Sequence, residues 1–231
     1  MTGSLVTPGA RARIRGLMTP IAVGLGRLGL TPNALTVIGF AIACVAAVLA
    51  AGQQWLAAGL LVVFGGVFDL FDGALARATD RVSNLGAFMD SVFDRWGEGV
   101  VYVGIVAGSL AAGFAAGAVL AAAAMASAFM VSYVRAKAES LGFTTGSGMA
   151  SVGLAPREVR IAILTVGLVL TGLLGGVGAD TDSEGLLLSQ VPRPDGAYAL
   201  AVSLGLIAIL ATATTIQRIV HTIRQAQHQQ G

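Results

Sequence analysis

Four of the five aspartates in one 26-residue stretch of an otherwise apolar chain lie at spacings that suit a shared site. Asp69 and Asp72 are three residues apart. Asp90 and Asp94 are four residues apart, so on helices each pair falls on one face. The polar turn ATDRVSN, centred near Arg81, separates the two pairs. In an antiparallel helical hairpin, residues equidistant from the turn meet at the same depth, so we expect the four carboxylates to converge.

Carboxylates that converge in a low-dielectric site cannot all remain charged without cations nearby. Oxygen ligands of this kind suit hard divalent ions such as Mg²⁺ or Mn²⁺. Two such ions, about 3.5–4 Å apart, can hold a pyrophosphate and stabilise charge on a leaving phosphate. The alternative is that the acids only pair with Arg77, Arg81 and Arg95. A site for two divalent metals explains the shared helical faces better than these ion pairs do.

The composition is that of a membrane protein. The 231 residues are 55% hydrophobic and only 11% charged, with a mean hydropathy of +0.81. A soluble domain carries about 25% charged residues. We therefore predict an all-α, polytopic membrane protein with a single domain over residues 1–231. The one cysteine, Cys44, excludes a disulfide within the chain.

Six apolar runs approach the ~20 residues that a helix needs to cross a bilayer. The predicted transmembrane helices cover residues 33–51, 54–78, 84–110, 114–138, 157–177 and 197–219. Before them, residues 8–30 mix spaced arginines with apolar residues. This pattern predicts an amphipathic juxtamembrane helix that lies at the membrane surface and does not span it.

The basic residues are distributed unevenly between the two predicted sides of the membrane. With six spans, most arginines and the single lysine fall at the N-terminus, between spans 2 and 3, between spans 4 and 5, or at the C-terminus. These segments share one side. The loops of the opposite side hold Arg193 and four acids. The positive-inside rule predicts that both termini and the acidic cluster face the cytoplasm. The Ala/Gly-rich spans and the minimal length suit the inner membrane of a prokaryotic cell.

The acidic stretch resembles the signature of the CDP-alcohol phosphotransferase (CDP-alcohol phosphatidyltransferase) family. The chain matches it at all eight fixed positions, which read Asp69-x2-Asp72-Gly73-x2-Ala76-Arg77-x8-Gly86-x3-Asp90-x3-Asp94. The six-span layout fits the family as well, so the resemblance covers most of the chain. Members transfer a phosphoryl-linked group from a CDP-alcohol, often CDP-diacylglycerol, to an acceptor hydroxyl and release CMP.

The resemblance implies roles for the matching residues. The metal ligands would be Asp69, Asp72 and Asp90. Asp94 would be the general base on the acceptor hydroxyl, and we include it among the metal ligands as well. Residues around the cytidine and pyrophosphate would be Gly73, Ala76, Arg77 and Gly86. In the segment LTPNALT, Asn33 and Thr36 resemble first-span residues near the nucleotide, with helix capping as the alternative interpretation.

A second set of residues is basic and lies at the ends of the last three predicted spans. It comprises Arg135, Lys137, Arg157, Arg160 and Arg218. Converging cations can bind an anionic acceptor, and arginine is especially suited to phosphate. The alternative is that these residues only anchor helix ends at the cytoplasmic face.

The segments SYVRAKAE and PREVR resemble the inositol-phosphate branch of the family, which includes phosphatidylinositol-phosphate and archaetidylinositol-phosphate synthases. That branch holds the phosphate of inositol 1-phosphate with basic residues in this region. The resemblance therefore implies an enzyme of phospholipid synthesis that joins CDP-diacylglycerol and inositol 1-phosphate into phosphatidylinositol phosphate and CMP. Glycerol 3-phosphate, serine and free inositol remain alternative acceptors.

A different class of function is a divalent-cation channel or transporter, because intramembrane carboxylates also mark ion paths. This hypothesis predicts acids along a continuous path, whereas the four aspartates are expected at one depth. Two GxxxG pairs, Gly104/Gly108 and Gly113/Gly117, indicate close helix contacts within or between chains. The family commonly forms homodimers, which we expect here. We expect the lipid bilayer and no nucleic acid among the partners.

Overall fold

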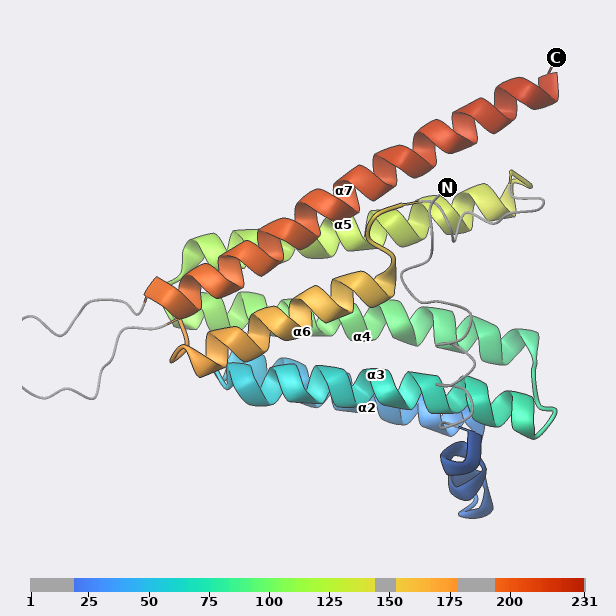
Figure 1. Ribbon diagram of the computed structural model, residues 1–231, viewed down its shortest axis with the longest axis horizontal. Coiled ribbons are helices and arrows are strands. Elements are labelled where there is room, and N and C mark those ends of the chain that lie inside the picture. Colours follow the sequence, from blue (N-terminus) through green and yellow to red (C-terminus); the bar gives the residue numbers. More distant parts are fainter. Residues whose placement is uncertain (1–18, 144–152, 178–193, 231) are drawn as a thin grey trace, which may run out of the picture.

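The computed structural model describes residues 19–143, 153–177 and 194–230. Within these ranges all regular structure is α-helical, as predicted (Figure 1). A short helix covers residues 19–27. The long helices are α2 (Pro32–Ala51), α3 (Trp55–Ala78), α4 (Asn84–Ala111), α5 (Ala115–Ser140), α6 (Arg157–Leu173) and α7 (Pro194–Gln230). Residues 8–18 of the predicted interfacial helix, and Arg193 with most of the acids of the last loop, lie outside the described residues.

Local capping explains where the helices that carry the site begin. Thr31 caps α2, where its side chain accepts a hydrogen bond from the Ala34 amide at 3.2 Å. Ser83 caps α4 in the same way, with the Gly86 amide at 3.0 Å. Between α3 and α4, Asp80 has a φ of 53°, a left-handed conformation that aspartate tolerates better than most residues. The turn therefore lies where the polar segment ATDRVSN predicts it.

Two predicted boundaries differ from the structure by four residues or more. Helix α6 ends at Leu173, short of the predicted residue 177, because Gly175 and Gly176 follow with φ values of 90° and 86°. Helix α7 continues to Gln230, past the predicted residue 219. Its last segment is polar but rich in the good helix formers Arg, Gln and Ala, so hydropathy falls while helix propensity does not. At 37 residues, α7 is about 55 Å long, which exceeds the ~30 Å hydrocarbon core of a bilayer.

Four of the described helices are long and apolar enough to cross a membrane. They are α2, α3, α5 and the part of α7 from Asp195 to Gln227. Helix α4 carries a cluster of charged residues between Asp90 and Glu98, and α6 has only 17 residues. The structure therefore supports a helical membrane protein, and the count of six transmembrane helices stays a prediction.

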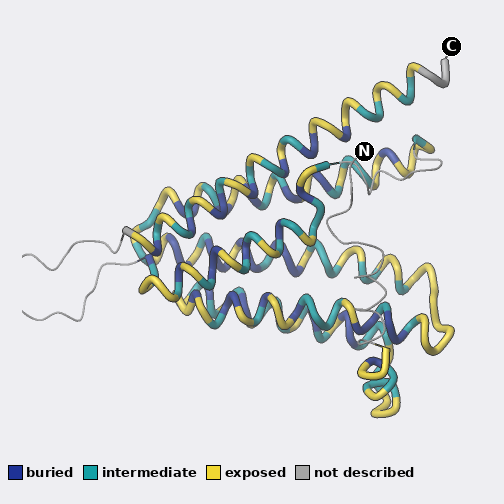
Figure 2. Tube along the Cα trace, viewed as in Figure 1, coloured by how far each residue is buried: buried dark blue, intermediate teal, exposed yellow. Residues whose placement is uncertain are grey.

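The packing of α3 and α4 differs from the expected hairpin. Helix α2 packs against both of them, while α3 also packs on α6 and α4 also packs on α5. Helices α3 and α4 run antiparallel but make little direct contact with each other. The buried core lies between the helices and includes Trp55, Tyr102 and Leu204, with exposed residues on the outer faces (Figure 2). Helices α5 and α7 diverge from α3 and α4 towards the end where the turn lies, which leaves the bundle open there (Figure 1).

One of the predicted GxxxG pairs makes a contact within the chain. A Cβ atom at Gly104 would overlap the backbone of Ala47, and one at Gly108 would overlap the carbonyl oxygen of Ala50. Both glycines therefore allow the backbones of α4 and α2 to approach closely. Gly113 lies in the turn after α4 with a φ of 72°, so its role is a left-handed turn.

Gly104→Ala should destabilise the protein by about 1–3 kcal/mol, because the added methyl group meets backbone, which cannot change rotamer. Thermal unfolding of purified protein in detergent measures the effect. Gly205→Ala on α7 is the matched control, since a Cβ atom there meets nothing within 4 Å. The control should leave the unfolding midpoint unchanged or raise it, because Ala favours a helix over Gly. Equal midpoints for the two variants would contradict the α2–α4 contact.

Candidate active site

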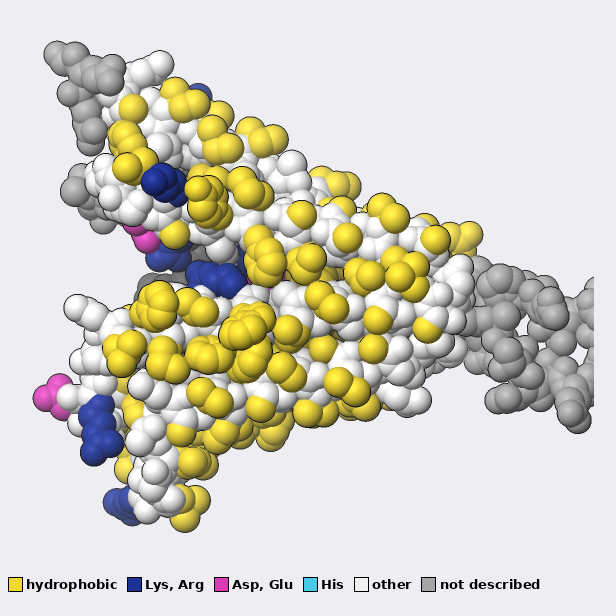
Figure 3. Space-filling model, turned by 180° about the vertical axis from the view of Figure 1, so that it is seen from behind, with side chains coloured by type: hydrophobic (Ala, Val, Ile, Leu, Met, Phe, Trp, Pro, Cys, Tyr) yellow, Lys and Arg dark blue, Asp and Glu magenta, His cyan; other side chains and the backbone are white. Residues whose placement is uncertain are grey.

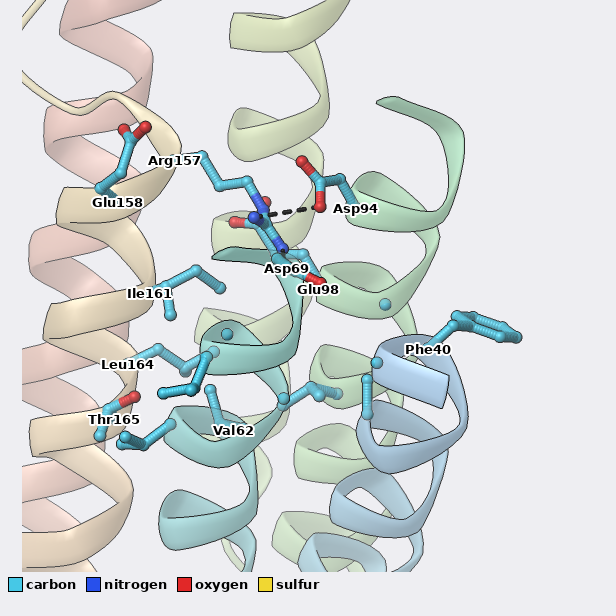
Figure 4. A pocket seen from close by; sticks show the side chains of 18 of the residues that line it. Phe40, Val62, Asp69, Asp94, Glu98, Arg157, Glu158, Ile161, Leu164 and Thr165 are labelled. Atoms are coloured by element: carbon cyan, nitrogen blue, oxygen red, sulfur yellow. Dashed lines mark hydrogen bonds and ion pairs between the residues drawn. The ribbon is translucent and has the colours of Figure 1, made fainter. Parts of the chain in front are cut away.

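A cavity of about 660 Å³ lies between α2, α3, α4 and α6 (Figure 4). Asp69, Asp90 and Asp94 line one part of it. Deeper in the bundle its walls are apolar and include Val62 and Leu164. The cavity therefore combines a carboxylate cluster with an apolar region large enough for part of a lipid-like substrate.

The structure brings the four predicted aspartates close to one another. Asp69, Asp90 and Asp94 lie within electrostatic range of one another, and Asp72 lies within range of Asp69 and Asp90. Asp72 is the most deeply buried of the four, with 5% of its surface exposed. The acids thus converge as the spacing predicts, but they do not meet across a packed hairpin. Asp69, Asp90 and Asp94 line the cavity, and Asp72 is buried beside them against Thr36.

Helix α2 supports the acids of α3. The hydroxyl of Thr36 donates a hydrogen bond of 2.7 Å to Oδ2 of Asp72. Gly39, one turn further along α2, leaves space for Asp69, because a Cβ atom at that position would lie 2.9 Å from Asp69 Oδ1. Thr36 therefore fixes the orientation of one carboxylate, and Gly39 makes room for another.

Arg157, the first residue of α6, lies between acids from two other helices. Its Nη2 atom is 2.9 Å from Asp69 Oδ2, and its Nη1 atom is 3.1 Å from Asp94 Oδ1 (Figure 4). Arg95 is also near Asp94, at 3.8 Å. Of the three arginines considered as partners from sequence, only Arg95 contacts one of the acids among the described ion pairs. The main partner is Arg157, which the sequence pattern assigned to an acceptor phosphate.

The donor set fits a hard divalent cation. Carboxylate oxygens from α3 and α4 face one cavity, and such oxygens are the ligands that Mg²⁺ and Mn²⁺ prefer. In the described part of the chain, no three acidic, histidine or cysteine side chains are arranged to hold one ion together as they stand. The Arg157 guanidinium lies between Asp69 and Asp94, and its position marks where this cluster stabilises positive charge.

The residues predicted to surround the nucleotide lie at the same end of the bundle. A Cβ atom at Gly86 would lie 3.5 Å from Asn33 Oδ1, so the start of α4 meets the start of α2. A Cβ atom at Gly73 would lie 3.3 Å from Nη1 of Arg77, whose exposed side chain extends past this glycine. Ala76 lies half-buried on the same helix. Because Gly73, Ala76 and Gly86 have small or no side chains, they leave open space beside the acids.

The predicted basic residues fall into three environments. Arg157 contacts the acids, whereas Arg160 is buried against Glu98 at 2.7 Å. On α5, Arg135 pairs with Glu139 at 2.8 Å, and Lys137 is exposed. Arg218 of α7 donates a hydrogen bond of 2.7 Å to the carbonyl oxygen of Val131 and lies within electrostatic range of Arg135 and Arg160. Figure 3 shows basic side chains beside the hollow at the open end of the bundle.

Glu98 is the residue at this site that the sequence analysis missed. It lines the cavity from α4 and is four residues beyond Asp94. The spacing of Asp90, Asp94 and Glu98 continues one helical face, so the sequence did contain a signal for it. Its partner Arg160 lies 62 residues away, which no local spacing reveals.

Comparison with known proteins decides the family. The family model for CDP-alcohol phosphatidyltransferase matches residues 29–183, which include all four aspartates. The chain belongs to the CDP-alcohol phosphatidyltransferase family. This confirms the resemblance in the acidic signature and makes the protein a transferase of this family.

Curated relatives in this family come from archaea and bacteria. The chain is 35% identical over 167 residues to the archaetidylinositol phosphate synthase of Pyrococcus horikoshii, covering 72% of this chain and 84% of the relative. It is 32% identical over 216 residues to the phosphatidylinositol phosphate synthase of Mycobacterium tuberculosis, covering 93% of this chain and 88% of the relative.

Solved structures of the Mycobacterium tuberculosis phosphatidylinositol phosphate synthase share the fold of this CDP-alcohol phosphatidyltransferase. The crystal structure with CDP-DAG bound superposes with a TM-score of 0.71 at 27% identity, covering 89% of this chain and 92% of that one. The complex with manganese and citrate gives a TM-score of 0.72 at 26% identity, covering 89% and 88%. The relative therefore binds CDP-DAG and manganese on the same fold.

Proposed function

We propose that the protein transfers the phosphatidyl group of CDP-diacylglycerol to a hydroxyl of inositol 1-phosphate, giving phosphatidylinositol phosphate and CMP. The family membership and the names of the relatives support the reaction class and this acceptor. The observation that carries the proposal is the position of Arg157. Its guanidinium lies against Asp94, and its buried Nε has no hydrogen-bond partner within the described residues. A hydrogen-bond donor for the phosphate of inositol 1-phosphate thus lies beside Asp94, the candidate base.

In this mechanism the acceptor hydroxyl oxygen bonds to the phosphorus that carries diacylglycerol. The P–O bond of the pyrophosphate breaks, CMP leaves, and Asp94 takes the hydroxyl proton. Mg²⁺ or Mn²⁺, two per active site at Asp69, Asp72, Asp90 and Asp94, would neutralise charge on the pyrophosphate. Thr36 keeps the Asp72 carboxylate oriented towards the cluster through its 2.7 Å hydrogen bond.

The remaining site residues would divide between the two substrates. The nucleotide would lie against the surface formed by Asn33, Gly73, Ala76, Arg77 and Gly86. The acyl chains of CDP-diacylglycerol would lie along the apolar walls of the cavity at Val62 and Leu164. The acceptor's phosphate would meet Arg157, with Arg135, Lys137 and Arg218 on the facing helices α5 and α7.

We further propose the arrangement in the membrane. The ends of α3, α5 and α7, and the beginnings of α2, α4 and α6, lie at one end of the bundle (Figure 1). Arg77, Arg81, Arg135, Lys137 and Arg224 lie near this end. This asymmetry supports six spans with the site and both termini in the cytoplasm of a prokaryotic inner membrane. A homodimer is proposed from the family resemblance.

CMP release by purified protein with CDP-diacylglycerol and Mg²⁺ tests the proposal. Inositol 1-phosphate, glycerol 3-phosphate, free inositol and serine are compared as acceptors. Release with inositol 1-phosphate alone supports the proposed acceptor. Release with another acceptor keeps the reaction class and overturns the acceptor. No release with any of them directs the assay to a CDP-alcohol with a different lipid.

The cation channel or transporter is disfavoured by the cavity itself. Below the carboxylates its walls are mainly apolar and include Val62, Val101 and Leu164, so apart from the hydroxyl of Thr165 their side chains give a moving ion few oxygen ligands. A liposome flux assay with Mn²⁺ distinguishes a transferase from a channel or transporter, because the transferase should not move Mn²⁺ across the membrane.

A further inference from the structure

Glu98 and Arg160 form a fully buried ion pair between α4 and α6. Arg160 Nε donates to Glu98 Oε1 at 2.9 Å, and Nη2 donates to Oε2 at 2.7 Å. Each side chain is only 1% exposed. This bidentate geometry fixes both the distance and the angle between the two groups, because the guanidinium fork and the carboxylate are planar.

The pair extends to a third helix. Arg160 Nη1 donates to the carbonyl oxygen of Ala155 at 3.0 Å. The amide of Ala155 in turn donates to Thr214 Oγ1 of α7 at 2.9 Å. The segment that leads into α6 is therefore tied to α4 on one side and to α7 on the other.

This network lies one helical turn below the proposed acceptor site. On α4, Glu98 is four residues after Asp94, and on α6, Arg160 is three residues after Arg157. Helix α6 packs chiefly on α3 and α7, so its connection to α4 runs through these charged side chains. The lower pair is therefore placed to hold Arg157 near Asp94.

Stability alone does not explain an ion pair at this depth. Two buried charges lose their hydration, and well-packed apolar residues of similar volume often stabilise a core as well or better. Ionisable side chains inside a membrane bundle are costly to insert and mark function. What the pair supplies, and an apolar pair cannot, is a directional link between two helices.

We propose that Glu98 and Arg160 are positioning residues that hold Arg157 in place to bind the acceptor phosphate beside Asp94. The inference rests on the proposed function, because it gives Arg157 the acceptor phosphate as its ligand. Arg160 itself acts through Arg157, since its own donors point to Glu98 and Ala155.

Arg160→Lys tests the proposal, because lysine keeps the buried positive charge but loses the planar fork. Binding of inositol 1-phosphate is measured by calorimetry on the full chain in detergent, in the wild-type and in the Arg157→Gln background. In the wild-type background we expect the affinity to fall about 10-fold. In the Arg157→Gln background the same substitution should change it little, because the residue through which it acts is gone.

An equal loss in both backgrounds, or no loss in either, overturns the positioning role. Should Arg160→Lys fail to fold, the double variant E98M/R160M replaces it in both backgrounds, since an apolar pair restores packing without a directional link. The wild type separates the two proposals. If it does not bind inositol 1-phosphate, the proposed acceptor fails and the inference falls with it. If the wild type binds inositol 1-phosphate and Arg160→Lys binds it with the same affinity, the inference alone fails.

Discussion

Asp94→Asn should lower the rate of CMP release by at least ~10²-fold while leaving the fold intact. Asparagine has nearly the same volume and can still accept a hydrogen bond from Arg157, which lies 3.1 Å from the carboxylate. It cannot take a proton from an acceptor hydroxyl, and general-base catalysis contributes about 10²–10⁴-fold. The measurement is CMP release at saturating CDP-diacylglycerol, with the thermal unfolding midpoint as the check on folding.

Asp80→Asn is the matched control for this substitution. Asp80 is exposed in the turn between α3 and α4, and asparagine tolerates its left-handed backbone equally well. The control should keep wild-type activity. Substantial activity in Asp94→Asn would refute the role of Asp94 as the base.

Metal binding separates a lost base from a lost ligand. Mn²⁺ binding, followed by electron paramagnetic resonance, gives a readout that does not depend on turnover. Asp69→Asn should lose Mn²⁺ binding and activity together. Asp94→Asn should lose activity by a larger factor than it loses Mn²⁺ affinity. Parallel losses in both variants would make Asp94 a ligand only.

Local sequence patterns predicted the parts of this site that depend on local structure. The i, i+3 and i, i+4 spacings placed each aspartate pair on one helical face, and the polar segment ATDRVSN marked the turn between α3 and α4. The acidic signature also identified the family, because its fixed positions combine four acids with small residues at defined spacings.

Contacts between distant segments were not predictable in this way. Spacing along a helix does not reveal that α2 packs against both α3 and α4, or that Thr36 reaches Asp72 across 36 residues. The sequence analysis includes Arg160 in the acceptor site because it belongs to the basic set at the ends of the last three predicted spans. The structure places Arg157 and Arg160 at different depths, and of the two only Arg157 contacts the aspartates. The length of α7 was underestimated because hydropathy measures membrane burial, whereas its polar end follows helix propensity.

Arg157→Gln should weaken binding of inositol 1-phosphate by about 10–100-fold, because a hydrogen bond to a charged group contributes about 1.5–3 kcal/mol. Arg95→Gln is the matched control. Arg95 has a similarly exposed side chain, 34% against 30%, and it also lies near Asp94. It should leave acceptor binding within about 2-fold of the wild type, because it lies outside the described cavity lining. Binding by calorimetry and the KM for each substrate check the prediction.

The same pair of variants also reports on the charge balance of the acidic cluster. Arg157 lies within hydrogen-bond distance of both Asp69 and Asp94, whereas Arg95 is 3.8 Å from Asp94 alone. Removing the Arg157 charge should therefore raise Mn²⁺ affinity more than removing that of Arg95, because it frees two carboxylates from a competing cation. We expect weaker acceptor binding together with tighter Mn²⁺ binding only if the Arg157 side chain contacts both the acceptor phosphate and the carboxylates. Unchanged acceptor binding in Arg157→Gln would leave Arg157 a partner of the acids alone and move the acceptor phosphate to Arg135, Lys137 and Arg218.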